Sequence, residues 1–362
     1  GTTAVAVAMA MAVATLKVAE GGYLWTPPMI NQMKETARAL GAEGKGILAA
    51  DESIGTIGKR FSHHSIENNE MNRRKFRQML LTAPDIEKYI SGVILFEESL
   101  YQQCDDGTPF LKLLQQRGMQ VGIKVDTGVV EIPGTCGETS TTGLDGLAQR
   151  CAAYYKLGAR FAKWRAVLRI DERNGCPSAL AIQDNAWCLA RFAAVCQSQG
   201  LTPLIEPDIL IDGSHSIERC SKVTERVLAA VFKALIDNHV SIEAIVLLPN
   251  MVRPGSESIQ PFAPLDVAEY TVRTLMRVVP SAVSTICFLS GGQAEDEATN
   301  HLRAIVRKAP QNSPWALTFS FGRALQSSAL KAWGGEDQKL KAAAEVFTER
   351  ARHNSEAAKG VR

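Results

Sequence analysis

The feature that most constrains the fold is a regular alternation of short apolar runs with helical patterns. Each run stops at or near a polar residue and is followed by an amphipathic segment. The runs are Gly46–Asp51, Gly92–Phe96, Val121–Asp126, Phe161–Arg165, Pro203–Glu206, Ala244–Leu248, Ile286–Ser290 and Trp315–Ser320. Runs this short predict strands rather than helices, and continuous apolarity is typical of parallel strands buried on both faces. Eight strand–helix units predict an α/β fold of the (β/α)₈ TIM-barrel type.

The segments between the runs have helical periodicity. Apolar residues recur at three-to-four spacing from Asn185 to Gln199, before a stop at Gly200, and again from Thr224 to Asn238. A doubly wound sheet is the alternative of similar length, but no G-x-G-x-x-G pattern follows the first predicted strand. The pattern therefore favours the barrel.

The domain organisation follows from the absence of any Pro- or Ser-rich linker past Gly21. We expect a single barrel domain over residues 23–362, preceded by an apolar segment, 1–22. Residues 1–16 are small and apolar, and the run is short for a membrane span. We interpret it as a flexible tail or the remnant of a processed leader, which predicts a cytoplasmic protein, or a plastid one if it is a leader.

Charge and cysteine usage exclude several classes of protein. The chain has 40 basic and 38 acidic residues, a net charge of +2, so neither a nucleic acid nor a membrane is an expected partner. The eight cysteines are scattered without a C-x-x-C pair, which favours a reducing compartment over a disulfide framework. None of the six histidines lies at a predicted strand end in a ligand arrangement, so we expect no metal and no cofactor.

Charged residues gather at the predicted C-terminal ends of the strands, where TIM barrels carry their active sites. Isolated buried charges are costly, so these groups must face one another or a ligand. The cations, with glycines at Ser290–Gly292 and Gly322, are suited to two phosphate groups; they are Lys59, Arg60, Lys124, Lys163, Arg165 and Arg323. Alternatively, Lys59 and Arg60 form a solvated turn.

Two carboxylates, Asp51 and Glu206, end strands on opposite sides of the predicted barrel. This arrangement suits general acid–base work on a hydroxylated substrate. Structural pairing with the nearby lysines is the alternative.

Seven segments together resemble the class I fructose-1,6-bisphosphate aldolases, in order and with matching spacing from Trp25 to Lys359. They are Gly46–Ser53, Gly122–Asp126, Phe161–Arg165, Glu206–Pro207, Pro249–Val252, Phe288–Gln293 and Leu317–Leu325. The resemblance implies cleavage of fructose 1,6-bisphosphate into two triose phosphates through a lysine imine. It also implies a homotetramer.

The resemblance assigns roles to individual residues. The residue matching Asp51 moves the proton of the C4 hydroxyl, the one matching Glu206 serves the carbinolamine steps, and the one matching Lys163 stabilises charge beside it. Asp208 replaces a usual glutamate of the catalytic set, and Thr56 replaces a usual serine. Phosphate is held at one end by residues matching Ser290, Gly291, Gly322 and Arg323, and at the other by those matching Ser53, Thr56, Lys59, Lys124 and Arg165.

The imine-forming segment departs from the family pattern. It reads Leu-Leu-Lys-Pro-Asn-Met-Val-Thr-Pro-Gly in the family, and here it is Val246–Gly255, with Leu248 at the position of the lysine. An alkyl side chain cannot form an imine. Arg253 replaces a small hydroxyl residue, and we expect its cation near the mouth. The sequence stops at Arg362, before the tyrosine-ending tail with which the family helps to move the C3 proton, so we expect turnover to suffer from this as well.

Three functions are compatible with this pattern. The first is a catalytically dead or strongly impaired aldolase homologue that still binds sugar phosphates. The second is an active aldolase with a surrogate nucleophile, for which Lys163 is the candidate: it lies on the fourth predicted strand, which carries the imine lysine in the related transaldolases, and we expect its surroundings to ease loss of its proton. The third is a purely structural or assembly subunit.

Overall fold

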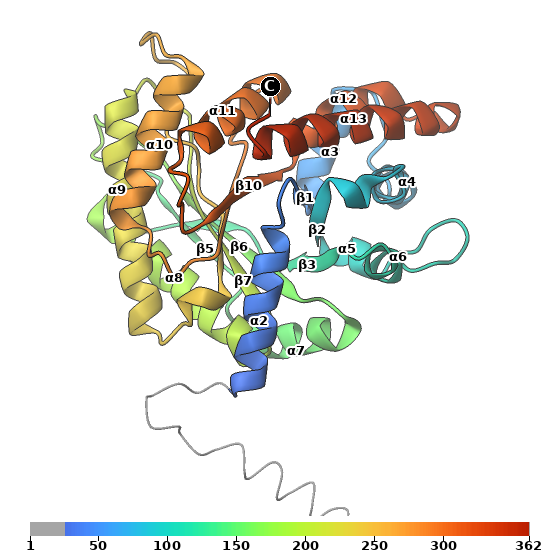
Figure 1. The fold of residues 1–362 in the computed structure, drawn as a ribbon, viewed down its shortest axis with the longest axis horizontal. Coiled ribbons are helices and arrows are strands. Elements are labelled where there is room, and N and C mark those ends of the chain that lie inside the picture. Colours follow the sequence, from blue (N-terminus) through green and yellow to red (C-terminus); the bar gives the residue numbers. More distant parts are fainter. Residues whose placement is uncertain (1–25, 362) are drawn as a thin grey trace, which may run out of the picture.

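All eight predicted strands are present, and they close into one parallel barrel in which each strand pairs with two neighbours (Figure 1). The computed structural model describes residues 26–361. The barrel strands are β1 (Gly46–Ala50), β2 (Ile90–Leu95), β3 (Gln120–Lys124), β6 (Phe161–Leu168), β7 (Thr202–Ile209), β8 (Val246–Leu247), β9 (Thr285–Phe288) and β10 (Ala316–Phe321). The prediction of a (β/α)₈ barrel is confirmed.

Helices surround the barrel. They are α2 (Pro27–Leu40), α3 (Ile54–Ser62), α4 (Glu70–Leu81), α5 (Glu97–Leu100), α6 (Phe110–Gln116), α7 (Leu147–Leu157), α8 (Ala179–Ser198), α9 (Ile217–Asp237), α10 (Pro264–Val278), α11 (Glu295–Lys308), α12 (Arg323–Trp333) and α13 (Leu340–Ala358), with short 3₁₀ turns at Ile86–Lys88, Ile242–Ala244 and Asp337–Lys339. The two helices expected from periodicity, α8 and α9, start earlier than expected. Ser178 and Ser216 cap them through their side chains, and such caps fix where a helix begins.

One hairpin was not expected from the sequence. Strands β4 (Val129–Glu131) and β5 (Thr139–Thr141) pair antiparallel outside the barrel, between β3 and α7. Each has only three residues, and β4 is exposed throughout, so neither produces an apolar run that pattern analysis can detect.

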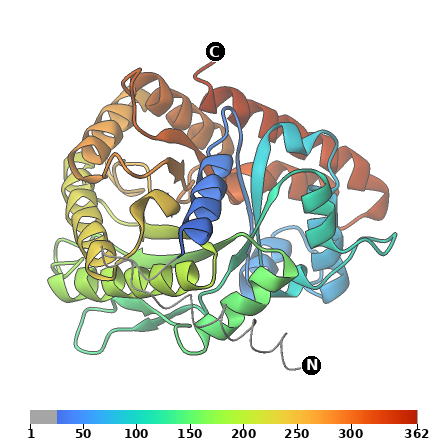
Figure 2. The ribbon, with the colours of Figure 1, turned by 60° about the horizontal axis from the view of Figure 1, so that its bottom comes forward.

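Helix α2 closes the N-terminal end of the barrel, across which it lies in Figure 2. Its last turns join the apolar interior through Ala37 and Leu40. The hydroxyl of Thr285 at the start of β9 donates to the carbonyl of Ala37 (2.7 Å), and Thr202 on β7 donates to Met33 (3.0 Å). These hydrogen bonds tie α2 to the N-terminal ends of the strands, whereas TIM barrels carry their sites at the C-terminal ends.

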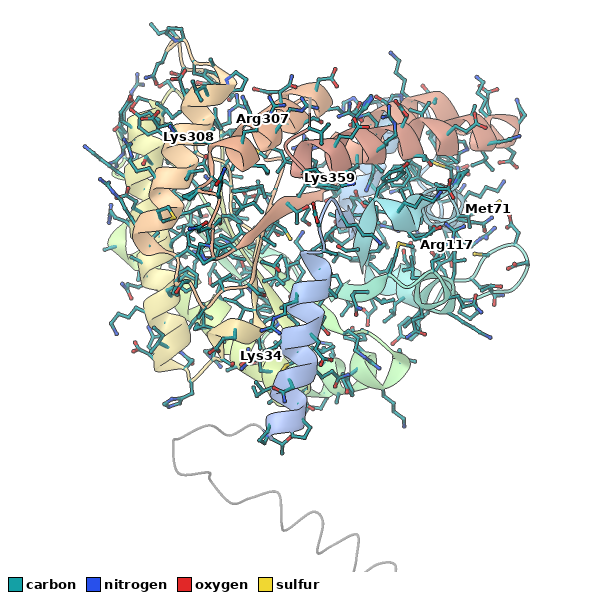
Figure 3. The ribbon with its side chains drawn as sticks, in the orientation of Figure 1. Lys34, Met71, Arg117, Arg307, Lys308 and Lys359 are labelled. Atoms are coloured by element: carbon teal, nitrogen blue, oxygen red, sulfur yellow. The ribbon has the colours of Figure 1, made fainter. Side chains whose placement is uncertain are left out.

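The apolar interior consists of side chains that alternate inward along the strands. It contains Ile47, Ala49, Ile94, Phe161, Leu204, Val246, Leu248, Cys287 and Leu289. Three of the cations labelled in Figure 3, Lys34 on α2 and Arg307 and Lys308 on α11, lie instead on the surrounding helices. Hydrocarbon thus fills the barrel up to the layer at which the inward positions become charged.

The predicted boundary between an N-terminal segment and the barrel domain, at residues 22 and 23, lies outside the described residues, as does the apolar run 1–16. Within 26–361, none of the helices combines the length and the apolarity that crossing a bilayer requires.

Candidate active site at the C-terminal end of the barrel

A buried lysine joins two carboxylates at the centre of the barrel mouth. Lys163 Nζ on β6 lies 3.0 Å from Asp51 Oδ2, directly after β1, and 3.0 Å from Glu206 Oε2 on β7. All three side chains are less than a tenth exposed. The structure therefore brings together three of the predicted catalytic residues, which alternate inward on their strands above the apolar interior.

Burial and charge act in opposite directions on these groups. Burial by itself would raise the pKa of Asp51, but Lys163, with help from Lys124, outweighs it and holds that pKa below its usual range. For Glu206, burial dominates the cations around it and raises the pKa to about 7. The two carboxylates thus have pKa values on opposite sides of the ordinary range, so one stays ionised while the other can exchange a proton near neutrality.

Lys163 differs from what we expected. Burial favours loss of its proton, but the nearby charges of Asp51 and Glu206 outweigh it, and the pKa of Lys163 lies above the ordinary lysine range. The expectation that its surroundings would ease deprotonation is therefore wrong. Sequence periodicity did not reveal that both carboxylates would lie within ion-pair distance of one amine.

Leu248 lies in the apolar interior, immediately after β8. Its amide donates to the carbonyl of Ile205 on β7 (2.8 Å), which continues the pairing of Ile205 with Leu247 and sets Leu248 beside Glu206. The side chain is 1% exposed and belongs to the same cluster as Val246 and Leu289. A side chain without any ionisable group thus follows β8, at the position beside Glu206 on β7.

A second ion pair borders a cavity of about 280 Å³ at the mouth. Arg165 on β6 donates through Nε (2.9 Å) and Nη2 (2.6 Å) to Oδ2 of Asp208 on β7. The second oxygen, Oδ1, is buried and has no hydrogen-bond partner among the described residues. The cavity is lined by Arg165, Asp208, Leu210, Ile211, Asp212, Ser256, Gly291, Gly292 and Arg323.

The two arginines that line this cavity have pKa values shifted in opposite directions. Although burial opposes its charge, Asp208 and Glu206 raise the pKa of Arg165 above its usual value. Arg323, at the start of α12, has its pKa lowered by burial and by the charges of Arg60 and Arg165. An arginine that burial and like charges destabilise gains from an anion, so this cavity is suited to a phosphate.

Four further residues predicted to bind phosphate lie on α3 or at its N-terminal cap and do not line that cavity; they are Ser53, Thr56, Lys59 and Arg60. Ser53 caps the helix by accepting from the amide of Thr56 (3.3 Å), and Lys59 is exposed in the last turn. Arg60 donates to Glu52 (2.5 Å) and to Gln326 (3.1 Å), so the alternative of a solvated turn is wrong for Arg60.

The remaining predicted residues lie around the same mouth. Lys124, at the end of β3, pairs with Asp126. Ser290 is buried after β9, and Gly322 leads from β10 into α12 beside the guanidinium of Arg60.

Several residues of this region were not identified by sequence analysis. Asp212 and Ser256 line the cavity from loops, where no periodic pattern marks them. Arg253, expected near the mouth, does not line the cavity: its guanidinium lies 3.0 Å from Glu297 on α11 and over the ring of Phe262. A carboxylate at the start of α11 and an aromatic face offer a buried cation more than the already cationic mouth does.

No group of three or more metal-ligating side chains occurs within the part of the chain that the structure describes. The cations, the carboxylates and the cavity are instead a combination that binds and polarises a phosphorylated, hydroxylated small molecule.

The sequence is similar to those of known proteins. Residues 32–361 match the family described as fructose-bisphosphate aldolase class-I. The chain is 55% identical over 337 residues to fructose-bisphosphate aldolase 6, cytosolic, of Arabidopsis thaliana, covering 93% of each chain. It is 56% identical over 330 residues to the cytoplasmic isozyme of Spinacia oleracea, covering 91% of each.

A solved structure is similar as well. The fructose-bisphosphate aldolase of Plasmodium falciparum, in complex with TRAP and a small-molecule inhibitor, superposes with a TM-score of 0.91 at 50% identity. The match covers 93% of this chain and 96% of that one.

Proposed function

This chain belongs to the class-I fructose-bisphosphate aldolase family, and from that premise we propose that it binds sugar phosphates but cleaves fructose 1,6-bisphosphate only at a strongly reduced rate. The observation that carries the proposal is Leu248. Its side chain is enclosed in the apolar interior beside Glu206, at the position where the family pattern has the imine-forming lysine. A hydrocarbon there supplies neither a nucleophile nor the electron sink that an imine provides.

The groups for proton transfer persist. In this proposal Asp51, kept ionised by Lys163, accepts the proton of the C4 hydroxyl. Glu206, whose pKa is about 7, exchanges a proton with the oxygen of the substrate carbonyl. Without a covalent intermediate beside them, these groups do not stabilise the carbanion that carbon–carbon cleavage leaves behind.

The groups for binding persist too. One phosphate would occupy the cavity lined by Gly291, Gly292 and Arg323, whose backbone amides and guanidinium are suitable donors to phosphate oxygens. The other would lie toward α3, near Ser53 and Lys59. Asp208 Oδ1, buried and unpartnered, is available to accept from a sugar hydroxyl.

The decisive experiment compares the rate of fructose 1,6-bisphosphate cleavage by the parent with that by Leu248→Lys. A coupled assay that detects the triose phosphates measures both rates. We expect a gain on the order of 10³-fold or more in the lysine variant, since an interaction made only along the covalent path is restored. Leu248→Met is the matched control, because it is long and unbranched without an amine, and it should stay at the parent rate. Rapid cleavage by the parent would contradict the proposal.

The surrogate mechanism through Lys163 has a separate test. It requires the amine to lose its proton, but Asp51 and Glu206 keep its pKa high. Borohydride trapping of the parent with a ketose phosphate, followed by peptide mapping, should give no adduct at Lys163. An adduct there would establish the surrogate.

A purely structural subunit is distinguished by ligand binding. Calorimetric titration of the parent with fructose 1,6-bisphosphate and with inorganic phosphate should show saturable binding. Without binding of either, only the structural function would be left.

For location and assembly, the plant relatives named cytosolic or cytoplasmic support a cytoplasmic protein, and nothing in the comparisons supports the plastid. We extend the family's homotetramer to this chain as part of the proposal, together with a single barrel domain over residues 23–362. Light scattering of the purified protein tests the tetramer: a monomeric mass would contradict it.

A further inference from the structure

Gln293 directly follows the glycine turn that lines the cavity, and its side chain is turned back beneath that turn. Its amide nitrogen Nε2 donates to the carbonyl of Ser290 (2.8 Å), and its backbone amide donates to the same carbonyl (3.0 Å). The side chain is buried. Ser290 O is therefore held from two sides by one residue.

The turn itself depends on such support. Gly291 and Gly292 have φ values of +52° and +85°, the left-handed region that glycine adopts without strain. Their backbone amides donate to no residue that the structure describes. Two glycines in succession have many accessible conformations, so the amides converge on an anion only where neighbouring groups fix the turn.

His301 on α11 orients Gln293. Its Nδ1 lies 2.5 Å from Gln293 Oε1. Since Gln293 Nε2 faces the Ser290 carbonyl, its oxygen faces the ring, and the ring nitrogen must be the donor. Burial lowers the pKa of His301 to about 4, so the ring is neutral at physiological pH and carries one N–H.

A further layer holds the imidazole. The ring of Phe262 packs against it, with centroids 6.0 Å apart, and the guanidinium of Arg253 lies over the Phe262 ring at 5.4 Å from its centroid. Arg253 is fixed in turn by Glu297. The chain of contacts runs from α11 through His301 and Gln293 to the turn at the cavity.

We propose that Gln293, held by His301, is a positioning residue that fixes the Ser290–Gly292 turn in the conformation that binds phosphate. The inference deepens the proposed function and rests on it. It predicts that the relay affects affinity for one phosphate group of the ligand and leaves the other unaffected, because only one end of the mouth contains this turn.

The test uses two monophosphates, fructose 1-phosphate and fructose 6-phosphate, titrated calorimetrically into the parent protein and its variants. Gln293→Met keeps the approximate shape of the side chain but removes its hydrogen bonds to the Ser290 carbonyl, to Met251 Sδ and to His301. We expect it to weaken binding of one monophosphate, and of fructose 1,6-bisphosphate, by about tenfold, and to leave the other monophosphate unchanged.

Two variants at the second position separate positioning from folding. His301→Leu should reproduce the loss, whereas His301→Asn, whose side-chain amide can still donate to Gln293 Oε1, should recover most of the affinity. If the Gln293 variant unfolds, the pair at His301 carries the test instead.

The outcomes distinguish the two proposals. Unchanged affinities in Gln293→Met and His301→Leu, or equal losses for both monophosphates, overturn the positioning role while leaving the proposed function intact. A parent that binds neither monophosphate nor the bisphosphate overturns the proposed function, and the positioning role with it.

Discussion

Strands β7 and β8 are neighbours in the barrel, yet their inward faces differ in character. On β7 the inward positions pass from Leu204 to Glu206, so the apolar interior ends one layer below the mouth. On β8 they pass from Val246 to Leu248 and remain apolar. The layer that is charged at Glu206 on β7 is therefore still apolar at Leu248, directly after β8. The ionisable groups of the mouth lie on the β7 side of this boundary.

The difference shows how much each kind of side chain depends on its surroundings. Glu206 is tolerated because Lys163 lies 3.0 Å away and because its own pKa rises. Leu248 needs only hydrocarbon neighbours. The charged side is consequently sensitive to the loss of any partner and to pH, while the apolar side is sensitive mainly to volume.

The largest effect on stability is expected from Lys163→Met. The substitution preserves apolar volume but leaves Asp51 and Glu206 buried without their cation, which costs about 3–5 kcal/mol in similar cases. The measurement is the free energy of unfolding from urea titration at pH 7. Adding Asp51→Asn to the variant should recover part of the loss, and additive losses in the double variant would show that the pair is not coupled.

Leu248→Ala is expected to cost slightly less, about 3 kcal/mol, because a cavity opens in a packed interior that relaxes only in part. Leu248→Met, which conserves volume, should cost less than about 1.5 kcal/mol. The same urea titration measures both. Equal stabilities of the alanine variant and the parent would mean that the interior beside β8 is loosely packed, and the comparison between the strands would fail.

The pH dependence of stability separates the two strands further. The pKa of Glu206 rises from 4.5 to about 7 on folding, so the folded protein binds this proton more tightly than the unfolded chain does. The contribution of Glu206 to the free energy of unfolding is therefore fully present below pH 4.5 and is lost as the pH rises toward 7. Glu206→Gln should remove this loss, which is on the order of 2 kcal/mol between pH 5 and 7. Asp51 acts the other way: its lowered pKa stabilises above pH 3.8 and is lost in stronger acid.

Unfolding of the parent and of Glu206→Gln at several pH values between 4.5 and 7.5 checks this expectation. Leu248→Met serves as the control and should keep the slope of the parent. A parent whose stability rises with pH over this window would reverse the sign and show that the charge of Lys163 dominates Glu206.

The barrel was predictable because parallel strands buried on both faces leave continuous apolar runs, and each of the eight predicted runs overlaps a barrel strand. The extent of β8 was less predictable. Its run begins at Ala244, but a 3₁₀ turn takes up Ile242–Ala244, and only Val246 and Leu247 pair as a strand. Hydrophobicity indicates burial, whereas strand bounds depend on hydrogen bonds that the sequence does not display.

At the site, the strand-end rule placed Asp51, Lys163 and Glu206 at one mouth, because residue order along a strand fixes height in a barrel. It did not give the proton affinity of Lys163, which depends on two distances of 3.0 Å across three strands. The contacts of Arg253 were likewise beyond reach, since its partners come from a loop and from α11.

The smallest effect concerns two adjacent cations of α3, which extend the comparison to the rim. Lys59 is exposed, and Lys59→Ala should change the free energy of unfolding by less than about 0.5 kcal/mol. Arg60 bonds Glu52 and Gln326, so Arg60→Ala leaves a buried carboxylate with fewer partners and should cost more, about 1–2 kcal/mol. Urea titration in low and in 0.5 M salt distinguishes them, because an exposed charge is screened and a buried pair is screened much less. If the two substitutions lower the free energy of unfolding equally, the hydrogen bonds of Arg60 to Glu52 and Gln326 contribute no stability. In that case, only the charged residues around Lys163 are destabilised by the loss of a partner.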